Sequence, residues 1–183
     1  MKIKIFALTH KKFEVPQDKM YQPLQVGREE KEDLGYLCDN TGDNISAENC
    51  YYSELTGLYW IWKNVHTYKY VGTCHYRRYL LNEQEKIFTE AEYLELLKDY
   101  DLITTKRVVL NNSYHYGFAT NHNIHALDMT GEVIKELYPE YYDTFVQLVN
   151  GTETYFAEML KKRPDVLMEA SDITGELKLS MQI

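Results

Sequence analysis

One segment of this sequence combines residue types that bind phosphate and sugar. It reads Cys74-His75-Tyr76-Arg77-Arg78-Tyr79 and ends an apolar run that begins at Tyr70. Arginine stays charged at every working pH and can bind phosphate through two parallel hydrogen bonds, and tyrosine can stack on a base or a sugar. The segment therefore suits the diphosphate of a nucleotide sugar. Consecutive side chains on an extended backbone point to opposite faces, which leaves open whether Arg77 or Arg78 instead pairs with a buried carboxylate.

Two further polar clusters follow apolar runs of the strand type. Thr9 and His10 come after Lys2–Leu8, and Thr105-Lys106-Arg107 comes after Asp101–Thr104. In open α/β sheets, ligands bind outside the carboxyl ends of the strands. We therefore expect Thr9 and His10 to lie beside a nucleotide, with His75, Tyr76, Arg77 and Arg78 around its phosphates.

A polar loop, Asp39–Ser46, contains two carboxylates and two amides in a short span. Its oxygen atoms could contact sugar hydroxyls or a divalent cation, although such residues also build ordinary turns. Asp39 and Asn44 are candidate substrate contacts. Asp43 is a candidate sugar contact or catalytic base.

Other catalytic patterns are absent from the sequence. His115, His122 and His125 match no zinc-site spacing, and the 3 cysteines form no C-x-x-C pair. No glycine-rich phosphate loop and no nucleophile elbow occur, which disfavours kinases, dehydrogenases and hydrolases. We assign no metal ligand from the sequence.

Length and charge bound the remaining possibilities. The chain has 183 residues, the length of one domain, and a net charge of −8, which disfavours binding along a nucleic acid. The 17 tyrosines suit sugars and bases but are also common in ordinary cores and surfaces. No apolar run reaches the length of a signal peptide or a membrane span. We expect a cytoplasmic protein that can associate peripherally with the inner face of the membrane.

Hydrophobic periodicity predicts the elements that position these residues. The predicted strands are Lys2–Leu8, a short one near Leu24–Val26, Tyr70–Cys74 and Asp101–Thr104. The predicted helices are Tyr51–Asn64, Phe88–Leu97 with an N-cap at Thr89, Asn123–Leu137, Tyr141–Val149 and Glu153–Lys162, while Asn111–Asn121 is a predicted loop. Alternating strands and helices favour an α/β fold with a parallel sheet.

Several motifs together resemble a known family. They are Phe6–Lys11, Gln25–Gly27, Asp33–Leu37, Thr41–Ser46, Tyr51–Asn64 and His75–Tyr79. The stretch Glu54–Asn64 followed by His75–Tyr79 is the most distinctive. Over Lys2–Phe156 the chain is similar to a bacterial family labelled a domain of unknown function, found in capsular and exopolysaccharide gene clusters and grouped with GT-A glycosyltransferases.

The resemblance implies a GT-A-like (Rossmann-like) fold, with a mixed, mainly parallel sheet flanked by helices and a helical C-terminal part. It implies one domain, in which residues 1–110 bind the nucleotide sugar, 111–162 are helical and 163–183 form a divergent or truncated tail. GT-A enzymes commonly hold Mg²⁺ or Mn²⁺ with an Asp-x-Asp motif. Here His75–Tyr79 takes that place, which favours a metal-independent protein without excluding either ion.

The implied activity is transfer of a sugar from a UDP- or dTDP-type donor to a bacterial surface polysaccharide or its lipid-linked precursor. Family members continue for several tens of residues beyond the part that matches Tyr155 and Phe156, whereas this chain ends at Ile183. A non-catalytic or truncated module that binds a nucleotide sugar or carbohydrate therefore stays open as the alternative. A hydrolase ranks last, because no nucleophile or metal set is found.

Overall fold

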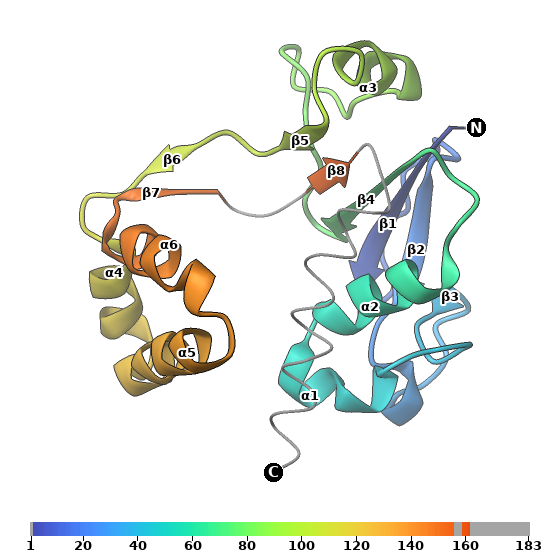
Figure 1. Ribbon diagram of the computed structural model, residues 1–183. Coiled ribbons are helices and arrows are strands. Elements are labelled where there is room, and N and C mark those ends of the chain that lie inside the picture. The colour runs from blue at the N-terminus through green and yellow to red at the C-terminus, as the bar shows by residue number, and fades with distance from the viewer. Residues whose placement is uncertain (1, 156–158, 162–183) are drawn as a thin grey trace. The chain divides into compact units, whose positions relative to one another are not determined.

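The computed structural model describes residues 2–155 and 159–161 (Figure 1). Its strands are β1 (Ile3–Thr9), β2 (Tyr21–Gln25), β3 (Leu37–Cys38), β4 (Tyr70–His75), β5 (Leu102–Thr104), β6 (Val108–Val109), β7 (Glu153–Thr154) and β8 (Met159–Lys161). Its helices are α1 (Asn49–Tyr52), α2 (Leu55–Asn64), α3 (Glu90–Leu96), α4 (Tyr114–Asn121), α5 (Ile124–Leu137) and α6 (Pro139–Asn150), with 3-10 turns η1 (Arg28–Glu30) and η2 (Ser46–Glu48). The chain divides into two compact units, and the second comprises Thr105–Phe156.

The first unit contains a 6-stranded sheet in the order β3-β2-β1-β4-β8-β5. The strands β3, β2, β1 and β4 are mutually parallel, and β8 runs antiparallel to both β4 and β5. The predicted α/β fold with a mixed, mainly parallel sheet flanked by helices is confirmed. The short predicted strand near Leu24 is the parallel strand β2, which lies between β1 and β3.

The central strand β1 is apolar along most of its length because both of its faces are covered. Ile3, Ile5 and Ala7 pack on one side with Tyr93 and Leu97, from α3 and the residue that follows it. Phe6 and Leu8 point to the other side and form a second core with Leu24, Val26, Trp60 and Ile61. Helix α2 thus lies against one face of the sheet, as Figure 1 shows.

Helix α2 approaches the sheet closely at Gly57. A Cβ atom at this position would lie 2.7 Å from Val26 Cγ1 and 2.9 Å from Leu8 Cδ2, so a larger residue would push the helix away from β1 and β2. The helix runs antiparallel to the strand that follows it, β4. Its N-terminal end therefore lies at the edge of the sheet where β1 and β4 end, which brings Glu54 next to His75.

The second unit is a small helical unit with a two-stranded ribbon. Helices α4, α5 and α6 pack against one another, and β6 pairs antiparallel with β7 (Figure 1). Gly131 of α5 allows close contact with Phe145 of α6, because a Cβ there would lie 2.9 Å from the phenyl ring. An ion pair of 2.8 Å between Arg107 and Glu153 links the two ends of the unit.

The local sequence patterns correctly predicted several elements. The strands at Lys2–Leu8, Tyr70–Cys74 and Asp101–Thr104 are present as β1, β4 and β5. Thr89 caps α3 with the predicted capping box, in which Glu92 bonds back to the Thr89 backbone. Both helices around Pro139 are also present.

Three predicted elements differ from the structure. The helix expected over Tyr51–Asn64 is interrupted at Ser53, whose φ of 49° no helix permits, so α1 and α2 are separate. The loop expected at Asn111–Asn121 contains helix α4, which Ser113 caps through the Tyr116 N–H. The helix expected at Glu153–Lys162 is wrong, because β7 and β8 lie there instead. The predicted tail, 163–183, lies outside the described residues.

Candidate functional site

The ends of β1 and β4 lie side by side in the sheet. Leu8 is opposite His75 in the parallel register, and the Tyr76 N–H donates to the Leu8 carbonyl at 3.1 Å. Since both strands end here, the residues that follow, Thr9 and His10 on one side and His75–Arg78 on the other, share one edge. The structure thus brings two of the three predicted strand-end clusters together.

The backbone turns sharply after β4. The Arg78 N–H donates to the His75 carbonyl at 2.9 Å and closes a turn at Tyr76 and Arg77. The extended backbone assumed from the sequence is therefore wrong here, and the alternation of faces that would separate the two arginines does not apply. Both arginine side chains are exposed, and neither guanidinium forms an ion pair with any other described residue.

The ring of Tyr76 is the packing centre of this edge. Tyr76 is only 9% exposed. The His10 and Phe13 rings lie 5.5 Å and 5.7 Å from it, and the His75 ring lies at 4.3 Å. The Arg77 guanidinium lies over the same ring at 5.1 Å. Tyr76 therefore holds the two histidines and Arg77 in position, and little of its ring is left for stacking on a ligand.

The two ring nitrogens of His75 face different partners. Nδ1 lies 3.2 Å from the Arg77 backbone nitrogen, whose N–H donates to it, and Nε2 lies 3.5 Å from Glu54 Oε1. Because Nδ1 accepts the Arg77 N–H, we assign the neutral tautomer that carries its proton on Nε2, the nitrogen nearer to Glu54. Burial is the main cause that lowers the pKa of His75, opposed by Glu54 and assisted by Arg77, Arg78 and His10.

The pKa of His10 is also lowered. Burial is the largest cause, and the positive charges of Lys11, Lys31 and Arg77 add to it, while Glu54 acts in the opposite direction. The side chains of His10, His75, Arg77 and Arg78, with Lys11 and Lys31 nearby, form a positively charged edge of the sheet, which we call the cationic edge. The protein as a whole has a net charge of −8. Such a local cationic cluster favours an anionic ligand regardless of net charge.

Thr9 lies at this edge but serves the backbone. Its side chain is 1% exposed, and its hydroxyl donates to the Lys11 carbonyl at 2.6 Å and accepts from the Lys11 N–H at 3.0 Å. Thr9 therefore shapes the turn that presents His10. We leave it out of the ligand set.

Asp39 joins three parts of the chain. Its carboxylate is fully buried and accepts four hydrogen bonds, from the Gly27 and Arg28 backbone N–H groups and from the hydroxyls of Ser46 and Thr56. The distances lie between 2.5 and 3.1 Å. With both oxygens already occupied, Asp39 has a structural role, and we leave it out of the ligand set as well.

Asp43 and Asn44 lie away from the cationic edge. Asp43 accepts a hydrogen bond from the Tyr59 hydroxyl at 3.0 Å, and its backbone is bonded on both sides by the Asn64 side chain. Asn64 ends α2, and Glu54 precedes its first residue, which separates them by about 15 Å along the helix. Asn44 completes a local turn through Gly42 and Ser46. The structure does not bring these two residues together with His75.

The third strand-end cluster belongs to the second unit. Thr105-Lys106-Arg107 follows β5, and Arg107 pairs with Glu153. Conversely, sequence reasoning missed Glu54, Lys31 and Phe13 at the cationic edge. Of these three residues, only Glu54 had a signal in the sequence, because it lies at the start of a helix that precedes β4. A helix between two parallel strands begins at the edge where the first strand ends.

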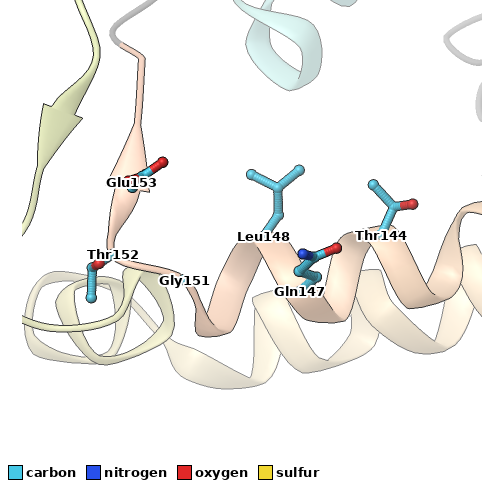
Figure 2. Close-up of a pocket in the computed structure, with 6 residues that line it drawn as sticks. All are labelled: Thr144, Gln147, Leu148, Gly151, Thr152 and Glu153. Carbon is cyan, nitrogen blue, oxygen red and sulfur yellow. The ribbon is translucent and has the colours of Figure 1, made fainter.

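An open pocket of about 410 Å³ lies in the second unit, and Figure 2 shows the residues that line it. Thr144, Gln147 and Leu148 of α6 line it together with Gly151, Thr152 and Glu153. None of these side chains forms a catalytic arrangement with a described neighbour. Among the described residues, no cluster of three or more metal-ligating side chains occurs. In that same part of the chain, no helix has the length and hydropathy needed to cross a membrane.

A family model described as a domain of unknown function (DUF4422) matches residues 4–172. The chain belongs to this family. It is also similar to the apo structure of WbbM, a bifunctional glycosyltransferase, with a TM-score of 0.84 and 26% sequence identity. That match covers 100% of the present chain but only 37% of the WbbM chain. No curated protein sequence matches significantly.

Proposed function

We propose that this chain binds a nucleotide-sugar donor and takes part in glycosyl transfer to a bacterial surface polysaccharide or its lipid-linked precursor. The cationic edge formed by His10, His75, Arg77 and Arg78 at the ends of β1 and β4 carries the proposal. Two exposed guanidinium groups without an ion pair among the described residues can bind both phosphates of a UDP- or dTDP-type donor. The similarity to a bifunctional glycosyltransferase supports the same reaction class.

The cationic edge also bears on the metal that related folds use. A divalent cation prefers several oxygen ligands, whereas the described residues of this edge offer two guanidinium groups, two imidazoles and a single carboxylate, Glu54. These residues do not fit Mg²⁺ or Mn²⁺. We therefore propose that arginine neutralises the leaving diphosphate, and no metal enters the mechanism.

A screen of nucleoside diphosphates and sugar nucleotides tests the proposed function. UDP or dTDP at about 100 times its Kd should raise the Tm by about 5 °C or more, with or without EDTA. A chelator that removes binding, restored by Mn²⁺, would contradict metal independence. Thermal stabilisation without release of diphosphate from any sugar nucleotide would favour the non-catalytic module. The absence of stabilisation by any nucleotide would reject the donor site itself.

Binding of UDP should strengthen as the pH falls from 8 toward 6. In the free protein the pKa of His10 lies below its usual range, so the ring is neutral at pH 8. A bound phosphate favours the protonated ring and raises that pKa, which couples binding to proton uptake. We expect His10 to contribute up to about tenfold in affinity for each unit by which its pKa rises.

Calorimetry with UDP across this pH range measures the effect, and His10→Gln should flatten the dependence. UDP itself titrates near pH 6, but this contribution is common to both proteins and cancels in the comparison. His66→Gln is the matched control, because His66 follows the far end of α2 and bonds to the Lys63 carbonyl. Equal pH slopes for wild type and His10→Gln would contradict the coupling.

A further inference from the structure

Glu54 is an exposed carboxylate at the cationic edge. It immediately precedes α2, and its side chain, 54% exposed, does not cap the helix. We propose that Glu54 is the general base that deprotonates the hydroxyl attacking the donor sugar. This inference rests on the donor site proposed above.

Glu54 lies beside His75. His75 Nε2 and Glu54 Oε1 are 3.5 Å apart, and the neutral His75 tautomer carries its proton on this Nε2. His75 is in turn held by the Arg77 N–H and by a tilted ring contact with Tyr76. A neutral imidazole beside Glu54 does not neutralise the carboxylate, whose oxygen lone pairs stay available to accept a proton.

Three carboxylates that precede Glu54 in the loops after β2 and β3 are engaged elsewhere. Asp39 is buried and accepts four hydrogen bonds, and Asp43 bonds to Tyr59 in the middle of α2. Glu29 accepts a hydrogen bond from Asn40. Glu54, by contrast, contacts a member of the cationic edge directly. A base must lie beside the donor to reach the reacting hydroxyl, and Glu54 lies 3.5 Å from His75 of the proposed donor site.

The reaction at this site is a direct displacement. The acceptor hydroxyl loses its proton to a Glu54 carboxylate oxygen while its oxygen forms a bond to the anomeric carbon of the donor sugar. The bond from that carbon to the diphosphate oxygen breaks, and its electron pair leaves with the nucleoside diphosphate. Arg77 and Arg78 stabilise the added negative charge on the leaving group. A single displacement inverts the configuration at the anomeric carbon.

The test separates turnover from binding in full-length variants. Release of UDP or dTDP is followed for the sugar nucleotides of the screen, and UDP affinity is measured by calorimetry. We expect Glu54→Gln to lower turnover by about 100-fold or more while UDP binds as tightly as before or more tightly. Formate should partly restore turnover to Glu54→Ala, and NMR of the product should show inversion. Glu95→Gln is the matched control, since Glu95 is an exposed carboxylate of α3 that pairs with Lys98 after the helix.

The other outcomes overturn the proposal in distinguishable ways. If Glu54→Gln keeps turnover within about threefold and only tightens UDP binding, Glu54 is a counter-ion of the cationic edge and not a base, and the proposed donor site stands. If both UDP binding and turnover collapse while Glu95→Gln is normal, Glu54 supports the structure of the edge. Product with retained configuration also rejects the displacement. If wild type turns over no sugar nucleotide, both the assignment of Glu54 as base and the transfer reaction are rejected.

Discussion

Asp39→Ala is expected to lower the free energy of unfolding by about 3–5 kcal/mol. The substitution removes the acceptor of two backbone N–H groups, at Gly27 and Arg28, and of the hydroxyls of Ser46 and Thr56. The donors of Gly27, Arg28 and Ser46 would lose their acceptor, and the Thr56 hydroxyl would keep only the Ser53 carbonyl at 3.1 Å. A buried donor without an acceptor costs about 1–3 kcal/mol. The turn after β2, the start of η2 and the first turn of α2 would lose their common anchor.

Urea unfolding followed by circular dichroism measures this loss. Asp39→Asn is the informative control, because the amide keeps the shape and one acceptor oxygen but places an NH₂ group against donors, so we expect an intermediate loss. Ser46→Ala removes one donor to Asp39 and the acceptor of the Glu29 N–H, and should cost about 1–2 kcal/mol. A midpoint for Asp39→Ala within experimental error of wild type would show that the buried carboxylate contributes nothing to stability.

Arg77→Ala and Arg78→Ala should each weaken UDP binding by about tenfold, and the double variant by about 100-fold. A charge-assisted hydrogen bond contributes about 1.5–3 kcal/mol, and exposure of both guanidinium groups at the same turn lets both reach one diphosphate. Lysine retains the charge but cannot bind in a bidentate manner, so Arg77→Lys should lie between Ala and wild type.

Calorimetry with UDP at constant salt measures these losses, and the Tm of each variant reports on folding. Neither arginine has an ion pair within the described part of the chain, so the Tm should stay close to that of wild type. Arg107→Ala is the matched control, because Arg107 pairs with Glu153 in the other unit. If neither single variant changes the Kd by more than twofold, the diphosphate lies elsewhere.

The cationic edge could be predicted from the sequence because its determinants are local. Apolar runs indicate β1 and β4, and parallel strands in an α/β sheet end at the same edge. His10 and His75–Arg78 were therefore expected near one another. The conformation of the segment was less predictable, because a turn at Tyr76 and Arg77 depends on one hydrogen bond and on two rings, His10 and Phe13, from the loop after β1.

The loop Asp39–Ser46 shows why composition alone misleads about function. Asp, Asn, Thr and Ser suit both ligand binding and turns, and only their partners distinguish the two roles. The partners of Asp39 lie 7 to 17 positions away in the sequence, at Gly27, Arg28, Ser46 and Thr56. Asp43 likewise bonds to Tyr59, which lies 16 residues later. No local pattern contains such pairings.

The α/β fold, the main strands and helices and the positively charged segment could all be predicted from the sequence. They follow from hydrophobic periodicity and capping residues, which act within a few positions along the chain. The roles of Asp39 as an anchor, of Asp43 beside Asn64 at the far end of α2 and of Glu54 beside His75 depend on contacts between distant segments. These contacts arise because helix α2 packs antiparallel to the strands, which places its first residues, and not its last, at the edge where β1 and β4 end.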